Sequence, residues 1–563
     1  MLPSADPHYG GQKWLALTAA VTLAMCLPYT QAIFSLGDEG VLWHAAVRML
    51  RGEFPYTGFF EFLPPGSLVI VTAWFSLTGL SVGSARSFAI LVTIGIACMT
   101  WLACRRAAAS GGTVSGGTAS GGTASGGTAS AGLATIMTLA WVAATQGTGT
   151  QINHHWLTTL CVMVLVWAAL PSPRMASPPM ASPPMASPAT SRPNPVFAGL
   201  AGGMASMIVP TCGALTMLAA LTAFPPVRRR VKPLIAYIAA GAVVPVMLIL
   251  WLLWHGAFLA AFEDVVIFPA THYASIQHVS YGAWTSPQSL PAVLVFPMAA
   301  LLTVLVVARD GAARFADPRF RPAVAFAIAG FIGCFPRPDA FHIAFQVPLA
   351  LPLLTCAMTS LSQGWKPVWR FASIFILCNG LATSGAAFTW LSIQTAGAAA
   401  TATPRGTAAL IGQDGFPAIM TRLAALPAAE PGFFYPFIPV FAVLTGREHV
   451  AKHDVFTPGY TTPEQYAEDC GAVMRRAAWI VIDRENTRPE VLRHMYPAMK
   501  DPTPPETVAF ERALDAGFAL TAQEGRFELR RRLDTATEAL CHDIAPSAPR
   551  NDIAPSTPRN SAR

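Results

Sequence analysis

Four carboxylates lie close together in a short polar stretch near the N-terminus. They are Asp38, Glu39, Glu53 and Glu61, and apolar runs flank the stretch on both sides. An ionised carboxylate can remove the proton of a hydroxyl group while a new bond forms on its oxygen. The pattern therefore predicts acid–base chemistry at a membrane surface. The alternative is that these carboxylates merely mark the boundary between membrane and water.

A second group of charged residues lies much later, between two short apolar runs. The segment 335–342 contains Arg337, Asp339 and His342. An arginine fork binds phosphate oxygens well, so Arg337 or His342 is a candidate for binding a phosphate group. The alternative is that these charged groups pair with one another at the membrane boundary.

Two further segments carry polar side chains beside the apolar runs. Residues 255–290 include His272 and Tyr273. This loop is expected either to cover a bound sugar, because aromatic faces stack on sugars, or to be a plain interfacial loop. The segment 153–155 starts an apolar run with two adjacent histidines. Adjacent residues do not share a helix face, so the pair suits a capping or water-facing role better than metal binding.

The composition excludes an ordinary soluble domain. Of the 563 residues, 53% are hydrophobic and only 12% are charged, and the mean hydropathy is +0.45. These values indicate a polytopic membrane protein. The net charge of +7 comes largely from arginines at the ends of apolar runs, so it reports membrane topology and not nucleic-acid binding. The sequence shows no P-loop, no dinucleotide-binding motif and no zinc-type spacing of cysteines and histidines.

Apolar runs that could cross a membrane divide most of the chain, and they predict a mainly α-helical bundle of about 11–13 spans. The expected spans lie at 14–34, 66–82, 85–104, 132–146, 156–170, 196–224 (two short spans that meet near Pro210), 234–254, 291–308, 323–335, 343–360 and 371–394. Two low-complexity stretches, 109–130 and 171–195, interrupt this series. We expect both to be flexible linkers.

Basic clusters orient the chain in the membrane. Lys13 suits a cytoplasmic N-terminus, and the basic loops 228–232, 309–321 and 366–370 belong on the cytoplasmic side. The region after residue 395 then lies outside the cytoplasm. Counting forward from the N-terminus places the first low-complexity stretch outside, whereas counting back from the C-terminus places it inside. The two counts differ by one crossing, so one of the early predicted spans does not cross the membrane as assigned.

The sequence divides into a membrane domain (1–394), a small extracytoplasmic α/β domain (395–541) and a disordered tail (542–563). In the second domain, strands are expected at 432–436, 478–483 and 525–529, and helices at 463–477 and 506–517. Its only cysteines, Cys470 and Cys541, can form a disulfide in an oxidising compartment.

The polar stretch near the N-terminus also contains a short amphipathic helix. Between residues 41 and 50, apolar side chains recur at helical spacing, and Trp43, His44 and Arg48 fall on the other side. This pattern predicts a helix that lies in the membrane interface with its apolar side toward lipid or neighbouring helices.

This stretch resembles the GT-C glycosyltransferases, in particular the bacterial relatives of protein O-mannosyltransferases and aminoarabinose transferases. The resemblance rests on Asp38 and Glu39 soon after the first apolar run, on Gly-x-x-Pro-Tyr-x-x-Phe-Phe over 52–60, and on Pro-Pro-Gly at 64–66. The segment 335–342 is similar to a second signature of these enzymes. The resemblance implies a GT-C-like fold.

The resemblance also implies roles for particular residues. Asp38 matches the loop aspartate that acts as general base or orients the acceptor, and Glu61 lies where relatives keep a second acidic residue. Phe62 and Leu63 replace the lysine that follows this glutamate in relatives. The expected substrate-binding residues are Glu39, Glu61, Tyr56, Arg337, Asp339, His342, His272 and Tyr273.

The expected function is transfer of a hexose or pentose from a polyprenyl-phosphate carrier to a cell-envelope glycan, lipid or protein. The reaction would occur on the outer face of the cytoplasmic (inner) membrane, with the lipid bilayer as the surrounding partner and no nucleic acid. A divalent cation, Mg²⁺ or Mn²⁺, is a possible cofactor without assigned ligands.

The main alternative is a transporter or flippase of lipid-linked sugars, which would also need many spans and buried polar residues. Transporters tend to show internal repeats, and this chain shows no such symmetry. A membrane scaffold that presents the C-terminal domain is a third possibility, and the carboxylate-rich loop argues against it.

Overall fold

The computed structural model describes residues 7–108, 123–145, 150–171, 193–224, 231–360, 400–410 and 415–544, with scattered positions between 367 and 393. The expected span at 371–394 lies partly outside these residues and is helical at its described positions, and the expected disordered tail falls largely outside them. So do the two low-complexity stretches, except that helix α5 begins at Thr123 inside the first one. Extending an existing helix costs far less than nucleating one, so the apolar part of α5 carries helical structure back into the repeat.

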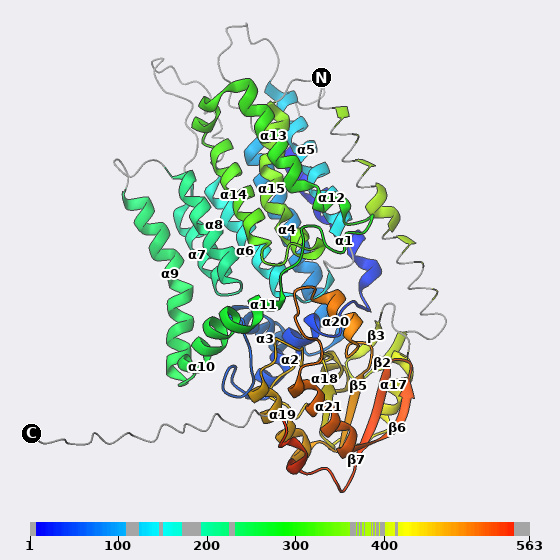
Figure 1. The fold of residues 1–563 in the computed structure, drawn as a ribbon. Helices are drawn as coiled ribbons and strands as arrows, with labels where there is room; N and C mark the ends of the chain where they lie inside the picture. Colours follow the sequence, from blue (N-terminus) through cyan, green and yellow to red (C-terminus); the bar gives the residue numbers. More distant parts are fainter. Residues whose placement is uncertain are drawn as a thin grey trace, which may run out of the picture.

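Most described elements are helices that pack side by side (Figure 1). They are α1 (Pro7–Cys26), α3 (Gly66–Thr78), α4 (Val82–Ala108), α5 (Thr123–Thr145), α6 (His154–Ala169), α7 (Pro195–Ser206), α8 (Pro210–Ala220), α9 (Val231–Trp254), α13 (Val295–Asp310), α14 (Phe320–Gly333) and α15 (Ala340–Ser360). Helix α15 is buried among α4, α5, α6, α13 and α14. The expected bend near Pro210 is confirmed, because α7 and α8 meet there.

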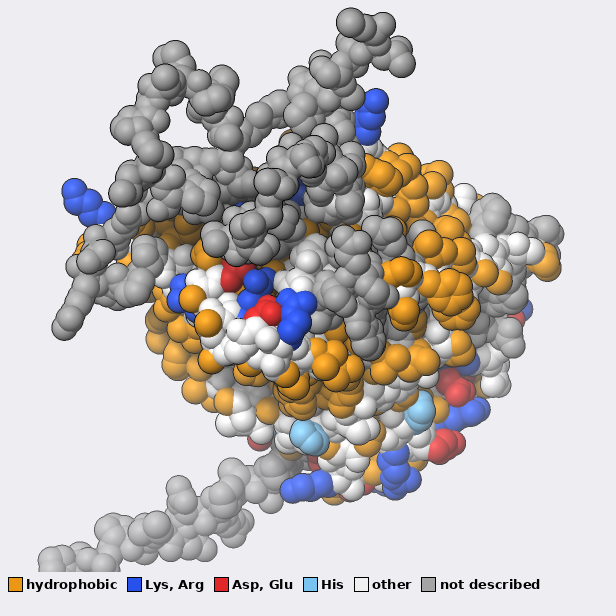
Figure 2. All heavy atoms as spheres, turned by 90° about the horizontal axis from the view of Figure 1, so that it is seen from above, with side chains coloured by type: hydrophobic (Ala, Val, Ile, Leu, Met, Phe, Trp, Pro, Cys, Tyr) orange, Lys and Arg blue, Asp and Glu red, His pale blue; other side chains and the backbone are white. Residues whose placement is uncertain are grey.

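Four described helices are long and apolar enough to cross a membrane: Val82–Ala108, Val231–Trp254, Leu290–Asp310 and Ala340–Ser360. Shorter apolar helices lie beside them. In a view down one end of the bundle, hydrophobic side chains cover much of the described surface, and charged side chains gather near its centre and along part of its rim (Figure 2). A broad apolar surface of this kind suits contact with lipid.

The structure explains the conflict in the topology count. Helix α3 has 13 residues, about 20 Å of helix, and is too short to cross the apolar core of a bilayer. The span predicted at 66–82 is therefore not among the described helices that are long enough to cross a membrane. The predicted span at 14–34 is also displaced, because α1 starts at Pro7 and ends at Cys26, just before Pro28. Arg105, at the end of α4, packs against Gly11 near the start of α1, so these two helix ends share one side of the bundle.

The strands form two small sheets at one end of the bundle (Figure 1). The first has the order β1-β3-β2, from β1 (Ala32–Ile33), β2 (Ala400–Thr403) and β3 (Gly406–Leu410). The second has the order β4-β5-β7-β6, from β4 (Gly432–Tyr435), β5 (Trp479–Asp483), β6 (Phe518–Glu524) and β7 (Phe527–Arg532). Strand β1 pairs in parallel with β3, so the chain just before Asp38 is hydrogen-bonded to the C-terminal region.

Five helices accompany these sheets: α17 (Phe416–Ala424), α18 (Val440–Thr445), α19 (Pro463–Arg476), α20 (Pro489–Met495) and α21 (Pro505–Gly517). The strands and helices expected between 432 and 529 are present, and β6 is an additional strand that the sequence did not reveal. The expected bridge between Cys470 and Cys541 is confirmed, with their Cα atoms 5.9 Å apart. It ties α19 to the end of the described chain.

Helix α2 (Asp38–Leu50) lies between the bundle and the C-terminal elements (Figure 1). The helix predicted here is present, and Trp43, His44 and Arg48, on the side opposite its apolar residues, are also buried. The C-terminal region covers this side of the helix. His44 Nδ1 lies 2.9 Å from a carboxylate oxygen of Asp454, and Arg48 donates to backbone carbonyls of the same segment. The helix that begins with Asp38 is thus held from both sides.

Candidate active site

Asp38 occupies the first position of α2, where its backbone N–H donates to Ser35 Oγ (3.0 Å). Its side chain is exposed, yet enough protein surrounds it for burial to have the largest effect on its pKa. Burial raises the pKa of the Asp38 carboxyl, while Arg337 and His342 partly offset this effect. The structure therefore brings the N-terminal carboxylate and the later charged segment into one group.

Arg337 is fixed on three sides. Nε donates to Asp339 (3.0 Å), Nη1 to Gln277 Oε1 (2.6 Å) and Nη2 to the Met495 carbonyl (3.0 Å). A guanidinium carries five N–H donors, so these three bonds leave two donors for a further partner. The side chain is 16% exposed, so that partner can come from outside the protein.

Two aromatic rings enclose the same guanidinium. Its central carbon lies 4.8 Å from the ring centroid of Trp284 and 5.2 Å from that of Tyr496. Trp284 has a φ of 57°, a left-handed conformation that is rare for a large side chain and costs about 1–3 kcal/mol. The backbone is thus strained where it places an aromatic ring over Arg337. Such enclosure holds the arginine in place for a planar or phosphate-like partner.

Asp339 organises the start of α15. One carboxylate oxygen accepts the backbone N–H groups of Phe341 and His342, both at 2.9 Å. The two oxygens lie 2.9 and 3.0 Å from His342 Nδ1. Burial opposes ionisation of Asp339, but the bonds and charge of His342 together with Arg337 outweigh it and lower the pKa. The pairing that the sequence offered as the simpler alternative is therefore present, and it leaves donors of Arg337 and one ring nitrogen of His342 available.

The adjacent histidines stand beside this group. Asn153 caps α6 and accepts the backbone N–H of His155 (2.8 Å), which confirms the expected capping role of the segment 153–155. The ring centroids of His155 and His342 are 4.9 Å apart, in an edge-on arrangement. Sequence reasoning missed this contact, because no local pattern relates the start of α6 to the start of α15.

An aromatic cluster lies near Asp38 and Arg337. Tyr273 stacks on Phe62 with centroids 5.0 Å apart, and Tyr460 lies 5.9 Å from Tyr273. Tyr273 and Tyr496 both interact electrostatically with Asp38 and Arg337. Tyr460 and Tyr496 were not predicted, because they come from the C-terminal region and carry no recognisable motif. His272 instead contacts Phe268, with centroids 5.4 Å apart, and Thr271.

Glu61 forms a second acidic position in the loop before α3. Its side chain is 2% exposed and accepts the backbone N–H of Leu63 (3.1 Å). Burial is the main reason that the pKa of Glu61 rises to about 8, and the nearby carboxylates Asp454 and Asp264 add to the effect. Tyr56, at a φ of 71°, donates its hydroxyl to the Leu63 carbonyl (2.7 Å). Glu61 and Tyr56 thus share one short turn.

Glu39 is fully buried and paired with Arg86, which is also buried. Arg86 Nη2 donates to Glu39 Oε2 (3.0 Å), and the backbone N–H of Ile152 donates to Glu39 Oε1 (3.2 Å). Arg86 also donates to the Thr150 carbonyl (3.1 Å). This pair ties α2 to α4 and to the chain just before α6. It thereby fixes the position of the neighbouring Asp38.

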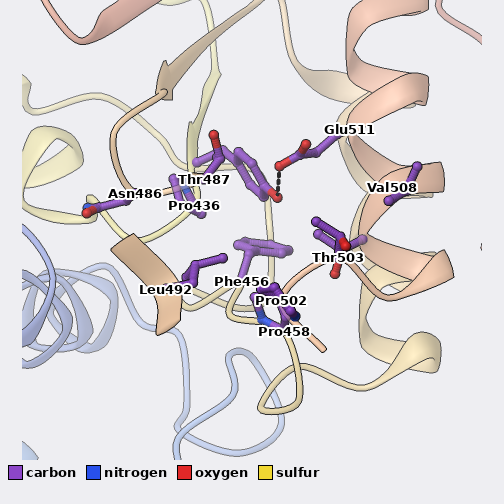
Figure 3. A pocket seen from close by; sticks show the side chains of 12 residues that line it. Pro436, Phe456, Pro458, Asn486, Thr487, Leu492, Pro502, Thr503, Val508 and Glu511 are labelled. Atoms are coloured by element: carbon purple, nitrogen blue, oxygen red, sulfur yellow. Dashed lines mark hydrogen bonds between the residues drawn. The ribbon is translucent and has the colours of Figure 1, made fainter. Parts of the chain in front are cut away.

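Two further features complete the description of this end of the molecule. Within the described ranges, no group of three or more His, Cys, Asp or Glu residues is arranged to hold a metal ion. A small, separate pocket lies in the C-terminal region between β4 and α21, where the Tyr435 hydroxyl donates to Glu511 (Figure 3). Leu492 of α20 lines this pocket, and the ring of Tyr496, one turn later, lies beside Arg337.

No protein-family model matches the chain, and no curated protein matches its sequence. Its structure is similar to two crystal structures of ArnT from Cupriavidus metallidurans, one bound to undecaprenyl phosphate and one in the apo state. The TM-score is 0.52 in both cases, at 15% and 12% sequence identity, and each match covers 93% of this chain and 99% of ArnT. ArnT is an aminoarabinose transferase of the GT-C class. The chain therefore has a GT-C glycosyltransferase fold, as its N-terminal carboxylate stretch predicted.

Proposed function

We propose that this protein is a membrane glycosyltransferase that moves a sugar from a polyprenyl-phosphate carrier to a cell-envelope acceptor. The observation that carries the proposal is that the accessible carboxylate of Asp38 lies close enough to the partly exposed guanidinium of Arg337 to interact with it electrostatically. A base and a phosphate-binding group are the two functions that such a transfer needs. The undecaprenyl phosphate bound to ArnT supports a polyprenyl-phosphate donor for this chain.

The reaction is a single displacement at the anomeric carbon of the donor sugar. The acceptor oxygen forms a bond to this carbon while the bond from the carbon to the phosphate oxygen breaks, and its electron pair leaves with the phosphate. Asp38 takes the acceptor proton, which is favourable because burial raises the proton affinity of this carboxylate. Arg337 stabilises the charge of the departing phosphate through its free donors. Attack from the face opposite the leaving group inverts the anomeric configuration.

The remaining predicted residues take supporting roles in this proposal. Tyr273 offers an aromatic surface to the sugar, while Tyr56 and Glu61 shape the loop beneath it. His272 lies at the edge of the aromatic cluster and contributes to binding only through Phe268. Glu39 acts as a positioning residue for Asp38, because its buried ion pair leaves it no access to substrate.

The proposal includes the location of the site. The bundle (1–394) lies in the cytoplasmic membrane, and the segment 395–541 forms an extracytoplasmic domain that packs against α2. Contacts from His44 and Arg48 to the 451–454 segment support one continuous unit at the outer face. The acceptor is an envelope glycan, lipid or protein, and it approaches from this side.

The test compares Asp38→Asn with wild type in native membranes supplied with radiolabelled undecaprenyl-phosphate pentoses and hexoses. The amide keeps the size of the side chain but cannot accept the proton, so we expect transfer to fall by about 10²–10⁴-fold. Glu53→Gln is the matched control, since Glu53 is a partly exposed carboxylate of the same loop that pairs with Arg48. Near-normal transfer by Asp38→Asn would contradict the assignment. Transport of the labelled lipid without transfer would favour the flippase alternative.

A further inference from the structure

The loop between α13 and α14 carries an arginine whose charge has no partner. Arg319 is only 9% exposed, and its Nε is fully buried without a hydrogen-bond partner. Its backbone N–H donates to Asp317 Oδ1 (2.8 Å), but none of the described residues accepts a hydrogen bond from the guanidinium. A guanidinium stays protonated in proteins, and a charge that is nearly buried without a counter-ion is strongly unfavourable. Arg319 therefore requires an anion that these residues do not supply.

The carboxylates of the same loop are already engaged. Asp310 accepts hydrogen bonds from Nε and Nη2 of Arg309 (2.7 and 2.9 Å). Asp317 lies 3.3 Å from Arg314 and also accepts a backbone N–H of the turn. Residues 309–321 contain four arginines and only these two aspartates, so the loop keeps a net positive charge.

Two other arginines of the loop bind neutral groups on neighbouring helices. Arg314 Nη2 donates to Ser360 Oγ (2.6 Å) at the end of α15. Arg321 Nε donates to the carbonyl of Thr222 (3.0 Å), just after α8. These bonds hold the loop against the ends of both helices, but they bring no negative charge to it.

The chain that continues from these two contacts has no acidic residue. Residues 225–230 follow the contact at Thr222, and residues 361–399 follow the contact at Ser360. Neither sequence contains an aspartate or a glutamate. No carboxylate is therefore available a few residues away along the chain, and the simplest source of the missing negative charge is another molecule.

The loop lies about one membrane thickness from the candidate active site. Helix α15 begins at Ala340, beside the site, and ends at Ser360, where Arg314 contacts it. Its 21 residues span about 30 Å, which matches the apolar core of a bilayer. Figure 2 looks onto this end of the bundle and shows charged side chains near the centre of a largely apolar surface. The loop therefore lies at the level where lipid head groups meet the bundle.

Exposed apolar side chains continue from this loop along the bundle. Leu301 and Val304 are exposed on α13, Ile328 is exposed on α14, and Phe315 is exposed in the loop itself. A free phosphate ion would contact only the arginines. A phosphate joined to hydrocarbon chains would contact the arginines and also cover the apolar faces of both helices. The surroundings of Arg319 thus favour a lipid over a free anion.

We propose that the loop between α13 and α14 binds the phosphate group of an anionic phospholipid, with Arg319 as its main ligand. The terminal nitrogens of Arg319 donate to the phosphate oxygens, and the lipid supplies the missing counter-ion. Its acyl chains lie along α13 and α14. This site is independent of the proposed transfer, because the two lie at opposite ends of α15.

The test compares full-length wild type with Arg319→Gln, both purified in neutral detergent and washed free of lipid. Without lipid, Arg319→Gln should have the higher Tm, because it removes a nearly buried charge that has no partner. Added phosphatidylglycerol should raise the Tm of wild type above that of the variant, so the order reverses. In native mass spectrometry, wild type should bind phosphatidylglycerol about tenfold more tightly than Arg319→Gln or better.

Two controls define the ligand and the residue. Arg309→Gln removes a charge from the same loop, but Arg309 is 42% exposed and paired with Asp310, so this variant should bind phosphatidylglycerol like wild type. Phosphatidylcholine carries the same phosphate without net charge, and inorganic phosphate carries the charge without acyl chains. Neither should stabilise wild type as much as phosphatidylglycerol does.

Three results would overturn the proposal. If lipid-free wild type is more stable than Arg319→Gln, the arginine has a partner within the protein. If Arg309→Gln loses phosphatidylglycerol as strongly as Arg319→Gln does, the attraction is a diffuse effect of surface charge. If inorganic phosphate alone gives the full stabilisation, the ligand is a free anion and not a lipid. None of these results bears on the proposed transfer, which Asp38→Asn tests separately.

Discussion

Replacing Glu61 by Gln should change how the stability of the protein depends on pH. The carboxyl group is 2% exposed, no cation offsets its burial, and its pKa is raised from 4.5 to about 8. The folded protein therefore keeps this proton at pH values where the unfolded chain releases it. Stability falls as pH rises from 4.5 through 8, because folding then requires either a protonated acid or a buried charge.

The size of the effect follows from the shift. A change in pKa from 4.5 to about 8 corresponds to about 5 kcal/mol of stability lost once the pH exceeds 8. Water that enters around the ionised group would reduce this figure, so a loss of a few kcal/mol is the working expectation. Glutamine has nearly the same shape as the protonated acid and does not ionise. The variant should therefore match wild type near pH 5 and exceed it in stability above pH 8.

The measurement is thermal unfolding of detergent-solubilised protein at pH 5, 7 and 9, followed by the fluorescence of its 14 tryptophans. We expect the difference in Tm between Glu61→Gln and wild type to grow steadily with pH. Glu53→Gln should show no such trend, because Glu53 is 37% exposed and paired with Arg48. A pH-independent difference at Glu61 would refute the reasoning and would mean that the carboxylate is solvated or has a cation partner in the protein.

Three further predictions follow from the same geometry. Glu39→Gln leaves its buried arginine partner unpaired and should lower the free energy of unfolding by about 3–5 kcal/mol, measured by chemical unfolding in detergent. Arg337→Lys keeps the charge but loses the fork, so transfer should fall while the Tm stays within a few degrees, and unchanged transfer would argue against phosphate contact. A reporter that is active only in the cytoplasm should stay silent when fused to the C-terminus, and strong activity there would separate the C-terminal region from the outer face.

The parts of the site that could be predicted are those with a local signature. Asp38 stands out because it follows an apolar run and precedes a turn rich in proline and glycine. Arg337, Asp339 and His342 stand out because three charged residues fall between two apolar runs. Each signature depends on a few neighbouring positions, so it can be recognised in a single sequence without knowledge of the fold.

The assembly of these parts could not be predicted, because it depends on how distant helices pack. Asp38 lies near His342 only because α2 lies at the end of the bundle where α15 begins. The same packing explains why the side of α2 that carries His44 and Arg48 is buried. His44 and Arg48 are polar because Asp454 and backbone carbonyls of the C-terminal region face them, and that partner lies far away in the sequence.

The ends of α4 and α6 show where this chain tolerates change in length. Both helices start at the end of the bundle that carries the candidate site, α4 beside Arg405 and α6 beside His342. They end side by side, where Arg106 donates to the Leu170 carbonyl. The 27 residues of α4 span about 40 Å, so Ala108 and Leu170, which precede the two repetitive stretches, lie about one membrane thickness from the start of α4. We therefore expect repeat units added or deleted next to these residues to leave the residues around Asp38 in place. The same two positions offer places to insert an epitope tag or a fluorescent protein.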